Sequence, residues 1–510
     1  MASTVQLVVS VLLLLFAYCI STRSSGKRHL PPGPKGWPII GNIFDVPKGV
    51  SHITYMEMAK TYGSDLLYLN MAGTSMLILH SVEAVNDLLV EQAAISSDRP
   101  RFPMVGDLCG WNFSLSLIPY GEQWRASRAL LAQQLSPQNM QTYQKPCIEE
   151  NIYQFLNRLV ETPEELQSHL YLLAGRSVLS TTYGIYPRDH HDPYLRTAEK
   201  ATRGFSEIAL RGTYQVDIFP ALKYVPEWFP GARFKARAKV EKANVEAMIC
   251  DTLEFTRRGM ENGTVRSSIA SRLLEEVQND ESWSEDKHVL LRNVLGSLYA
   301  AGVDTVAASI HTVILALVLN PDILKKGQAA VDVVVGRDRL PNLDDKGSIP
   351  YIDALVMEGL RWRPVVPLGM PHSTSQENIY RGYHIPANTI VIGNAWAILH
   401  NPATYGSDVD QFRPERFLNS DGTLNDKVPY PSAAFGYGRR VCAGKSIAQH
   451  KLWITVACLL ACFDLEKGVK AEPSTEYLNE VLSFPRPYEC TIKLRSKEIE
   501  ALIKAMVEAG

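Results

Sequence analysis

The sequence has 510 residues, of which 46% are hydrophobic and 21% charged, and its formal net charge is −2. This length suffices for one large domain or two ordinary ones, and a charge so near zero excludes a general electrostatic attraction to nucleic acid or anionic lipid. The eight cysteines are irregularly spaced and do not form a disulfide framework. No internal repeat, low-complexity tract or Gly/Ser linker divides the chain.

The first segment of distinct character, Val5 to Ile20, is almost wholly apolar. Its length falls between the core of a signal peptide and a full membrane helix. Positive residues follow this segment at Arg23, Lys27 and Arg28, and none precedes it, which favours a retained anchor over a cleaved signal and places the rest of the chain in the cytosol. The sequons at Asn112 and Asn262 are then expected to be chance matches.

A basic, Pro/Gly-rich run follows the apolar segment and contains the stiff sequence Pro31–Pro38, which cannot continue a helix. We therefore predict an N-terminal membrane anchor over residues 1–22, a hinge over residues 23–40, and a single domain over residues 41–510.

The domain begins with two short strand patterns, at Leu66–Leu69 and Met76–Leu79. From about residue 81 to residue 335, the spacing of the apolar residues mostly predicts helices. After Tyr351 it predicts a helix, short strands and coil, and a last strand at Cys490–Leu494 precedes a short helical tail. The predicted fold class is mainly α with smaller β regions.

Within the helical region, the run Ala301-Gly-Val-Asp-Thr305 interrupts a long apolar pattern that extends from about Val289 to Leu319. Gly302 weakens a helix, and Asp304 and Thr305 are polar groups in apolar company. The Thr305 hydroxyl can bond the carbonyl one turn back and open the helix locally. A helix with one exposed polar edge explains the same residues.

Two further groups of residues allow both structural and functional interpretations. Trp124 and Arg128 are four apart, so they share a helix face and fit a cation–π pair. Glu358 and Arg361 are three apart and fit a surface ion pair, although their neighbours are apolar and a charge pair in such company needs further partners. Arg416, in the later run Pro-Glu-Arg-Phe, is a candidate partner.

The most informative stretch is the loop from Phe435 to Gly444, which holds Cys442 just before a long apolar helix pattern, Ile447 to Phe463. A cysteine at a helix N-terminus is favoured as the thiolate by the free N–H groups and the helix dipole. The glycines of the loop allow close approach to a flat body, and Arg439 and Arg440 suit carboxylates. These features fit a seat for haem iron, while a zinc site and a nucleophilic cysteine remain open.

The loop resembles F-x-x-G-x-R-x-C-x-G, the cysteine-ligand signature of the cytochrome P-450 family of haem-thiolate monooxygenases. Glu358-x-x-Arg361 followed by the run with Arg416, the Ala301–Thr305 run, and Trp124-x-x-x-Arg128 are similar to further motifs of that family, in the same order. The resemblance extends from Pro31 to about Leu494. Ala443 replaces a proline that is frequent in fungal members, and Val306 replaces a frequent second threonine.

The resemblance implies the cytochrome P-450 fold, with haem b between a long distal helix and the helix that follows the cysteine loop. Cys442 would be the axial ligand of the iron, and Asp304 and Thr305 would relay protons on the distal side. Glu358, Arg361 and Arg416 would form a structural triad without a chemical role. The remaining cofactor-binding residues would contact the propionates or form the cysteine loop: Trp124, Arg128, His372, Arg440, Phe435, Gly436 and Gly444.

The resemblance also implies that O₂ and NADPH are consumed, with electrons from a separate NADPH–haemoprotein reductase and cytochrome b5 as a further donor, because the chain has no flavin or nicotinamide motif. Arg439, Lys445 and Lys451 are expected in the docking surface for the reductase. The expected location is the endoplasmic reticulum membrane, crossed once, with the catalytic domain in the cytosol and no nucleic-acid partner.

The substrate is expected to be small and lipophilic because the residues expected near it are large and apolar. The motifs are similar in detail to those of fungal enzymes of specialised metabolism. The first expected substrate is a terpenoid, and polyketides, indoles and aromatic xenobiotics are the alternatives. A haem-thiolate isomerase or dehydratase and a non-enzymatic haem sensor are the rival functions. The stretch from Phe219 to Pro230 is expected to face the membrane. The residues expected in the pocket are Phe102, Met104, Val105, Leu108, Trp111, Phe113, Ala301, Val365, Val366, Leu368 and Phe484.

Overall fold

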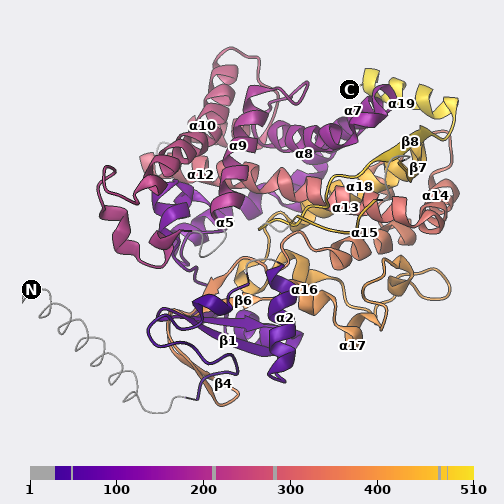
Figure 1. The fold of residues 1–510 in the computed structure, drawn as a ribbon. Helices are drawn as coiled ribbons and strands as arrows, with labels where there is room; N and C mark the ends of the chain where they lie inside the picture. Colours follow the sequence, from indigo (N-terminus) through magenta and orange to yellow (C-terminus); the bar gives the residue numbers. More distant parts are fainter. Residues whose placement is uncertain are drawn as a thin grey trace, which may run out of the picture. The chain divides into compact units, whose positions relative to one another are not determined.

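The computed structural model describes residues 29–47, 50–209, 214–278, 284–468, 473–478 and 481–509. By its internal contacts the chain forms two compact units (Figure 1). The first unit comprises Met1–Pro100, Leu368–Ile398 and Tyr437–Arg439, and the second comprises Arg101–Pro367, Leu399–Gly436 and Arg440–Gly510. The predicted membrane anchor lies outside the described residues, and the assignment of 41–510 to one domain stays a prediction.

The first unit is built on a four-stranded sheet in the order β1-β2-β6-β3. β1 and β2 are antiparallel, so that Leu66 pairs with Leu79, and β2 runs parallel to β6. One face of the sheet packs on Tyr55 and Ala59 of α2. The elements of this unit are η1 (Ile43–Asp45), α2 (Ser51–Thr61), β1 (Leu66–Met71), β2 (Thr74–Leu79), α3 (Val82–Val85), η2 (Asn86–Glu91), α4 (Ala93–Ser96), β3 (His372–Ser373), β4 (Asn378–Tyr380), β5 (Tyr383–Ile385) and β6 (Ile390–Gly393), and α16 (Ala395–Leu399) follows at its edge.

The described part of the predicted hinge is packed on this sheet. The Pro32 carbonyl accepts the Tyr68 N–H at 2.8 Å, and a Cβ at Gly33 would stand 2.0 Å from the Tyr68 carbonyl oxygen. Gly33 is therefore required by the close approach of two backbones. The described part of the Pro/Gly run forms no helix, as its composition predicts, and a hydrogen bond joins it to β1.

The second unit is mainly helical, with one β-hairpin in which β7 pairs with β8. Its principal helices are α5 (Glu122–Gln134), α7 (Lys145–Glu161), α8 (Leu166–Tyr183), α9 (Pro193–Ile208), α10 (Arg233–Glu261), α11 (Ile269–Gln278), α12 (Glu285–Gly302), α13 (Asp304–Leu319), α14 (Pro321–Val335), α15 (Pro350–Trp362), α18 (Lys445–Cys462) and α19 (Lys497–Ala509). The shorter elements are η3 (Pro103–Leu108), η4 (Trp111–Phe113), α6 (Pro137–Asn139), η5 (Met140–Gln144), η6 (Pro163–Glu165), η7 (Gln215–Asp217), η8 (Pro220–Tyr224), η9 (Leu343–Asp345), α17 (Pro402–Tyr405), η10 (Pro414–Phe417), η11 (Ser432–Phe435), η12 (Gly438–Arg440), β7 (Phe463–Lys467) and β8 (Cys490–Leu494).

Local sequence sets the ends of several of these helices. Asp192 caps α9, where its side chain accepts the N–H groups of Tyr194 and Leu195, and Pro193 takes the first helical position. α8 ends at Gly184, whose φ of 71° lies in the left-handed region that glycine adopts without strain. Ser284 caps α12 by accepting the Lys287 N–H.

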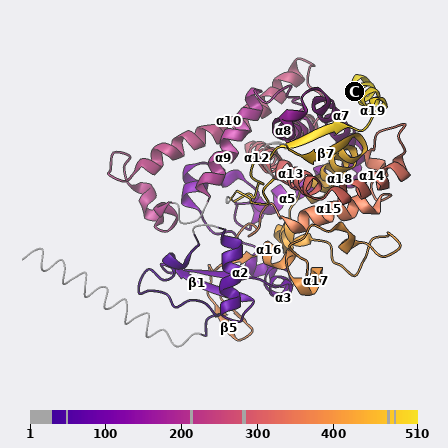
Figure 2. The ribbon, with the colours of Figure 1, turned by 45° about the vertical axis from the view of Figure 1, so that its right-hand side comes forward.

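α13 is the central helix of the second unit. It contacts α8, α15 and α18, and Figures 1 and 2 show it beside α18 and α15. Its residues from Val313 to Leu317 have no solvent exposure. Together α12 and α13 form a segment, Glu285–Leu319, that is long and apolar enough to cross a membrane, but 67% of its most apolar window is buried inside the protein. This segment is therefore the core helix of the second unit.

The predicted class, mostly helical with small sheets, is confirmed. The two early strands extend slightly beyond their predicted ranges as β1 and β2, and the last strand coincides with β8. The long apolar pattern from Val289 to Leu319 corresponds to two consecutive helices, α12 and α13, which meet at Val303.

Candidate functional site

The cysteine loop leaves η11 at Phe435 and enters α18 at Lys445. Gly436 follows with φ of 80°, a conformation that L side chains rarely adopt. The Cys442 N–H donates to the Phe435 carbonyl at 2.8 Å, which closes the loop, and Gly444 occupies the N-cap of α18. The sequence thus places Cys442 two residues before the N-cap of a buried helix.

Cys442 is a free cysteine with an exposed side chain, and the Gly444 N–H donates to its sulfur. Protein surrounds the thiol at longer range, and this burial raises its pKa above the usual value, against the lowering effects of the Gly444 N–H, Arg128 and Lys445. The Gly444 N–H at the start of α18 favours the thiolate, as the sequence predicts, but burial outweighs it in the polypeptide alone. A bound metal deprotonates a coordinating thiol through its own charge.

The glycines of the loop have different roles. A Cβ at Gly444 would stand 3.9 Å from the Cys442 sulfur, which is an ordinary van der Waals distance. The protein's own atoms therefore do not require glycine at this position. At Gly438, within the first unit, a Cβ would stand 2.0 Å from the Leu89 carbonyl oxygen. Packing against the protein's own backbone explains Gly438, so the interpretation that every glycine of the loop serves close approach to a cofactor is incomplete.

The predicted propionate residues of the second unit form two contacts. The Arg440 guanidinium lies 4.8 Å from the Trp124 ring and donates to the carbonyls of Leu115 and Ile118 at 3.3 and 2.9 Å. Arg128 Nη1 donates to the Val441 carbonyl at 2.7 Å, beside Cys442. The cation–π partner of Trp124 is thus Arg440, and Arg128 of the same helix face supports the cysteine loop.

His372 belongs to β3 of the first unit and is 3% exposed. Its Nδ1 lies 2.9 Å from the Ser96 carbonyl oxygen, and the preceding carbonyls of Met370 and Pro371 accept hydrogen bonds from Arg99. Its predicted role as a propionate ligand stays a prediction.

The Ala301–Thr305 segment lies at the junction of α12 and α13. The Thr305 hydroxyl donates to the Ala301 carbonyl at 2.7 Å, the bond one turn back that its sequence context allows. Ala301 is exposed, and Asp304 and Thr305 are half-buried, although the residues that follow from Val306 to Ala308 are buried. The core segment of the second unit is thus partly open to solvent at the turn where α12 meets α13.

Glu358, Arg361 and Arg416 form a buried network. Arg361 donates through Nε and Nη2 to the two Glu358 oxygens at 2.7 and 2.9 Å, and Arg416 Nε lies 3.0 and 3.1 Å from the same oxygens. The side chains of Glu358 and Arg361 have no solvent exposure, and that of Arg416 has 2%. The Arg413 N–H completes the coordination of Glu358 at 2.8 Å. These groups are brought together by α15 and η10, as the pairing of their motifs suggests.

The predicted pocket residues are distributed over several places in the fold. Val105 and Trp111 lie in a buried core with Phe113, and Phe102, Leu108 and Phe205 pack against it. Ser483 donates to the Val365 carbonyl at 2.8 Å, which brings the segment before Phe484 beside the end of α15. Met104 is buried, Val366 is half-buried, and Leu368 packs on the sheet of the first unit. Their role in substrate binding stays a prediction.

Of the cations predicted for partner docking, Lys451 is misassigned. It is 5% exposed in the middle of α18, and burial lowers its pKa to about 8. Lys445 is half-buried with its ammonium 4.8 Å from the Tyr430 ring, and Arg439 is exposed. A buried lysine presents no charge to a partner surface, so Lys451 belongs to the interior.

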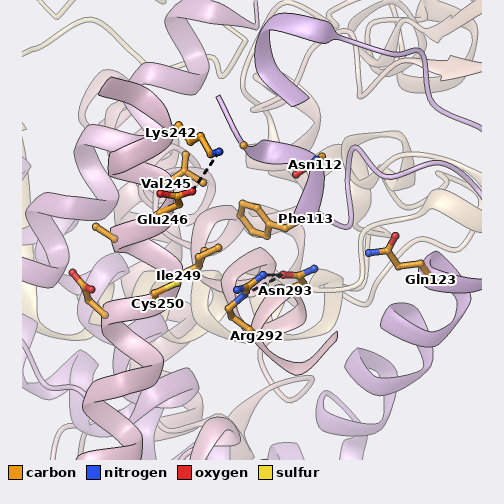
Figure 3. A pocket seen from close by; sticks show the side chains of 13 residues that line it. Asn112, Phe113, Gln123, Lys242, Val245, Glu246, Ile249, Cys250, Arg292 and Asn293 are labelled. Atoms are coloured by element: carbon orange, nitrogen blue, oxygen red, sulfur yellow. Dashed lines mark hydrogen bonds and ion pairs between the residues drawn. The ribbon is translucent and has the colours of Figure 1, made fainter. Parts of the chain in front are cut away.

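A pocket of about 750 Å³ opens elsewhere in the second unit, between α10, η4 and the first half of α12 (Figure 3). Charged groups of both signs line it: Lys242 pairs with Glu246 at 3.7 Å, and Arg292 donates to the Asn293 amide oxygen. It borders Phe113 but neither Cys442 nor the Ala301–Thr305 segment. It is therefore distinct from the site predicted for the cofactor.

The residues of the second unit fit a haem group. The donor set offers an exposed free thiol with one N–H on its sulfur, and Arg128 and Arg440 supply positive charge beside the loop. Gly436 and Gly444 have no Cβ atom, and a Cβ built at either position would make no close contact with the protein. The protein's own atoms therefore leave space beside the loop at both positions. A thiolate with hydrogen bonds to its sulfur is the haem ligation that favours O–O cleavage.

The sequence reasoning missed the contribution of Leu115, Ile118 and Tyr120. The first two hold Arg440 through their carbonyls, and the Tyr120 ring lies 5.9 Å from the Arg440 guanidinium. Backbone carbonyls carry no signal in residue type, so only the structure could reveal them. Tyr120 lies just before α5, where helical spacing does not apply, and its ring centroid is 5.0 Å from that of Trp124.

Comparisons with known proteins identify the family of the chain. The family model described as Cytochrome P450 matches residues 31–492. The chain is 39% identical over 502 residues to cytochrome P450 monooxygenase COX2 of Coprinopsis cinerea, covering 96% of this chain and 94% of the relative. It is 39% identical over 496 residues to cytochrome P450 monooxygenase ple1 of Rhodocybe pseudopiperita, covering 96% and 94%. It is 35% identical over 505 residues to tryptamine 4-monooxygenase of Psilocybe cyanescens, covering 97% and 99%. The chain belongs to the cytochrome P450 family.

Proposed function

We propose that this cytochrome P450 inserts one oxygen atom of O₂ into a small lipophilic substrate, using two electrons that NADPH supplies through a separate reductase. The observation that carries the proposal is the open turn at Ala301–Thr305, in the same compact unit as the exposed free thiol of Cys442. Half-buried polar groups within a core helix are suited to proton delivery.

The bound group in this proposal is haem b, which supplies the redox chemistry and the activation of O₂. Cys442 would hold its iron as the thiolate. The Gly444 N–H stabilises negative charge on the sulfur, and Arg128 and Lys445 contribute positive charge nearby. Arg440, fixed against Trp124, and Arg128 would neutralise the propionates.

Asp304 and Thr305 would deliver the two protons that the reaction consumes. The Thr305 hydroxyl donates to the Ala301 carbonyl and retains lone pairs that can accept a proton from a donor on its other side. Asp304, the first residue of α13, is half-buried and can exchange protons with water. Buried apolar neighbours such as Val306 and Ala307 keep bulk water from the rest of the helix.

The proposed substrate is a terpenoid. Exposed Ala301 and the half-buried Val365, Val366 and Phe484 would offer it apolar contacts, which suit a hydrocarbon skeleton. The relationship to tryptamine 4-monooxygenase favours an indole as the second candidate. An indole with a charged amine would need an anionic partner, which Asp304 could provide.

The proposed location is the endoplasmic reticulum membrane, with residues 1–22 as a single anchor and the remainder in the cytosol. A cluster of exposed aromatic side chains on the connection between α9 and α10 supports contact with lipid. Phe219, Tyr224, Trp228 and Phe229 are 56, 78, 81 and 50% exposed. Aromatic rings of this kind favour the interface between water and lipid.

The electron donor would be NADPH–haemoprotein reductase, with cytochrome b5 as an additional donor. Arg439 and Lys445 remain candidates for docking once Lys451 is excluded by its burial. Exchange of exposed Arg439 for glutamine should slow the reduction of the protein by its partner and make it less sensitive to salt.

The function is tested by expression in a microsomal host that contains the reductase, followed by metabolite profiling against terpenoid and indole panels. A product that requires both O₂ and NADPH supports the proposal. A product formed without O₂ would identify an isomerase or dehydratase. Haem binding without any product, in a preparation that the reductase reduces, would favour a sensor.

The location is tested by fractionation of the full chain and of a variant that lacks residues 1–22. The full chain should remain with membranes after a wash at alkaline pH, and the shortened chain should be released by it. Release of the full chain would contradict the anchor. Replacing Trp228 and Phe229 by serine in the shortened chain should further weaken its binding to neutral vesicles, because each loses apolar contact with lipid.

A further inference from the structure

The pocket between α10, η4 and α12 has no part in the proposed oxygenation (Figure 3). Its volume of about 750 Å³ lies within the range of sites that bind small molecules. The residues that line it belong to the second unit, and none of them is assigned above to the haem or to proton delivery. The chemistry of its lining therefore has to be explained by another ligand.

The inner wall of this pocket is apolar and buried. Phe113, Val245 and Ile249 line it and are 6, 1 and 5% exposed. A Cβ at Gly296 of α12 would stand 2.6 Å from Ile249 Cγ2 and 3.1 Å from Phe113 Cε2. Because Gly296 has no side chain, α10 and η4 both reach α12 at this point. The pocket thus offers packed hydrocarbon on its inner side.

Arg292 lies on α12 one turn before Gly296, on the same face of the helix, and it lines the pocket. Its half-buried guanidinium donates to the Asn293 amide oxygen, at 3.4 Å from Nε and 3.3 Å from Nη2, and forms no ion pair with a described residue (Figure 3). These bonds use the edge between Nε and Nη2. The edge between the two Nη atoms keeps its N–H groups, in the geometry that binds both oxygens of a carboxylate.

The other charges of the lining limit the charge of the ligand. Lys242 and Glu246 are exposed and pair with each other at 3.7 Å, and Asp251 is exposed at the rim. Water and salt screen these exposed groups, so Arg292 is the least screened charge of the pocket. One negative charge on a ligand would compensate Arg292, whereas a second would be opposed by the two carboxylates.

We propose that this pocket binds a small amphiphilic monocarboxylate, with its carboxylate on the Arg292 guanidinium and its apolar body against Phe113 and Ile249. A half-buried guanidinium with only a neutral amide as partner gains a charge-assisted pair, and the body of the ligand leaves water for the apolar wall. This site is independent of the proposed function, because its residues take no part in oxygenation.

The test uses octanoate as the probe and Cys250 as a reporter within the pocket. Cys250 is exposed and belongs to the lining, so its alkylation by iodoacetamide, measured by mass spectrometry of the digested protein, reports occupancy of this site. Octanoate should slow the alkylation of Cys250 in the haem-loaded full chain. Cys147, half-buried beside Ser180 and outside the pocket, is the reference in the same digest and should react at an unchanged rate.

Two further probes separate charge from hydrophobicity. Octanol has the same chain without a charge, and octyltrimethylammonium carries the opposite charge. Both should protect Cys250 less than octanoate does at the same concentration, because neither forms a charge-assisted pair with Arg292. Equal protection by either probe would overturn the proposal.

Variants of Arg292 test the residue itself. Arg292→Gln should raise the octanoate concentration needed for half-protection by about tenfold or more, and Arg292→Lys, which keeps the charge but not the fork, should have a smaller effect. The control is Arg257→Gln, which removes an exposed arginine of α10 outside the pocket and should leave protection unchanged. Full protection in Arg292→Gln, or no protection of the wild type by octanoate, would contradict the site. If Arg292→Gln does not load haem, Arg292→Lys and the three probes decide.

Discussion

The Glu358–Arg361–Arg416 network and the Ala301–Thr305 segment both hold polar side chains within the second unit, but they satisfy them differently. The Glu358 oxygens accept hydrogen bonds from two guanidinium groups and one backbone N–H, in full burial. Among the described residues, the Thr305 hydroxyl makes one hydrogen bond, to the Ala301 carbonyl, and the turn around it is partly open. Polar atoms whose hydrogen-bonding capacity is fully used hold a structure in place, whereas polar atoms with unused capacity remain available for chemistry.

The largest effect should come from breaking the satisfied network. Glu358→Ala leaves two buried guanidinium groups without their carboxylate, which costs about 3–5 kcal/mol in the free energy of unfolding. Denaturant unfolding of the purified protein, or the yield of haem-loaded protein where purification fails, measures this loss. The control is Glu254→Gln on α10, which removes an exposed pair with Arg257 and Arg258 and should leave the unfolding midpoint in place. A similar midpoint for Glu358→Ala would show that the network is dispensable.

Lys451 allows a direct comparison with this network, because it is a buried cation and no carboxylate partner for it is found among the described residues. Its pKa is about 8 in the folded protein and near 10.5 in the unfolded chain, so the unfolded state binds more protons between these values. Stability therefore rises as pH increases from 8 to 10.5 and is lowest below pH 8, by up to about 3 kcal/mol.

The measurement is the unfolding free energy of wild type and Lys451→Met at pH 7 and pH 10. The difference isolates Lys451 from other groups that titrate in the same range. The methionine variant should be the more stable at pH 7, and its advantage should shrink at pH 10. An advantage that is equal at both pH values would mean that the ammonium is already solvated.

The smallest effect on stability, and a clear one on chemistry, should come from Thr305→Ala. Loss of one half-buried hydrogen bond changes the free energy of unfolding by about 1 kcal/mol or less. Product formed per NADPH should fall about tenfold, with the difference appearing as hydrogen peroxide. Ser309→Ala, one turn further along α13 and bonded to the Thr305 carbonyl, is the control. Unchanged coupling in Thr305→Ala would remove this residue from proton delivery.

Much of the fold and of the site's layout could be read from periodicity and motif spacing. The strand at Cys490–Leu494 and the hydroxyl bond of Thr305 follow from local rules that the rest of the fold does not override. The partners of Glu358 required an ordered pair of motifs, since no local rule connects α15 with Arg416 across 58 residues.

Other features could not be predicted because they depend on packing between distant segments. Lys451 follows the polar residues Gln449 and His450 and precedes an apolar run, so its sequence context does not distinguish a buried lysine from an exposed one. The pairing of Arg440 with Trp124, and the raised pKa of Cys442, likewise depend on the surrounding atoms of the folded protein. Burial is a property of the whole fold, so short-range patterns report it poorly.

The central claim, that Cys442 binds haem iron as a thiolate, is tested most directly by the absorption spectrum of the reduced protein under carbon monoxide. Cys250→Ser, which changes an exposed cysteine of α10, is the control for Cys442→Ser. Wild type and Cys250→Ser should show the red-shifted Soret band of thiolate ligation, and Cys442→Ser should lose it. A wild-type spectrum without that shift, or a shift that survives in Cys442→Ser, would contradict the assignment.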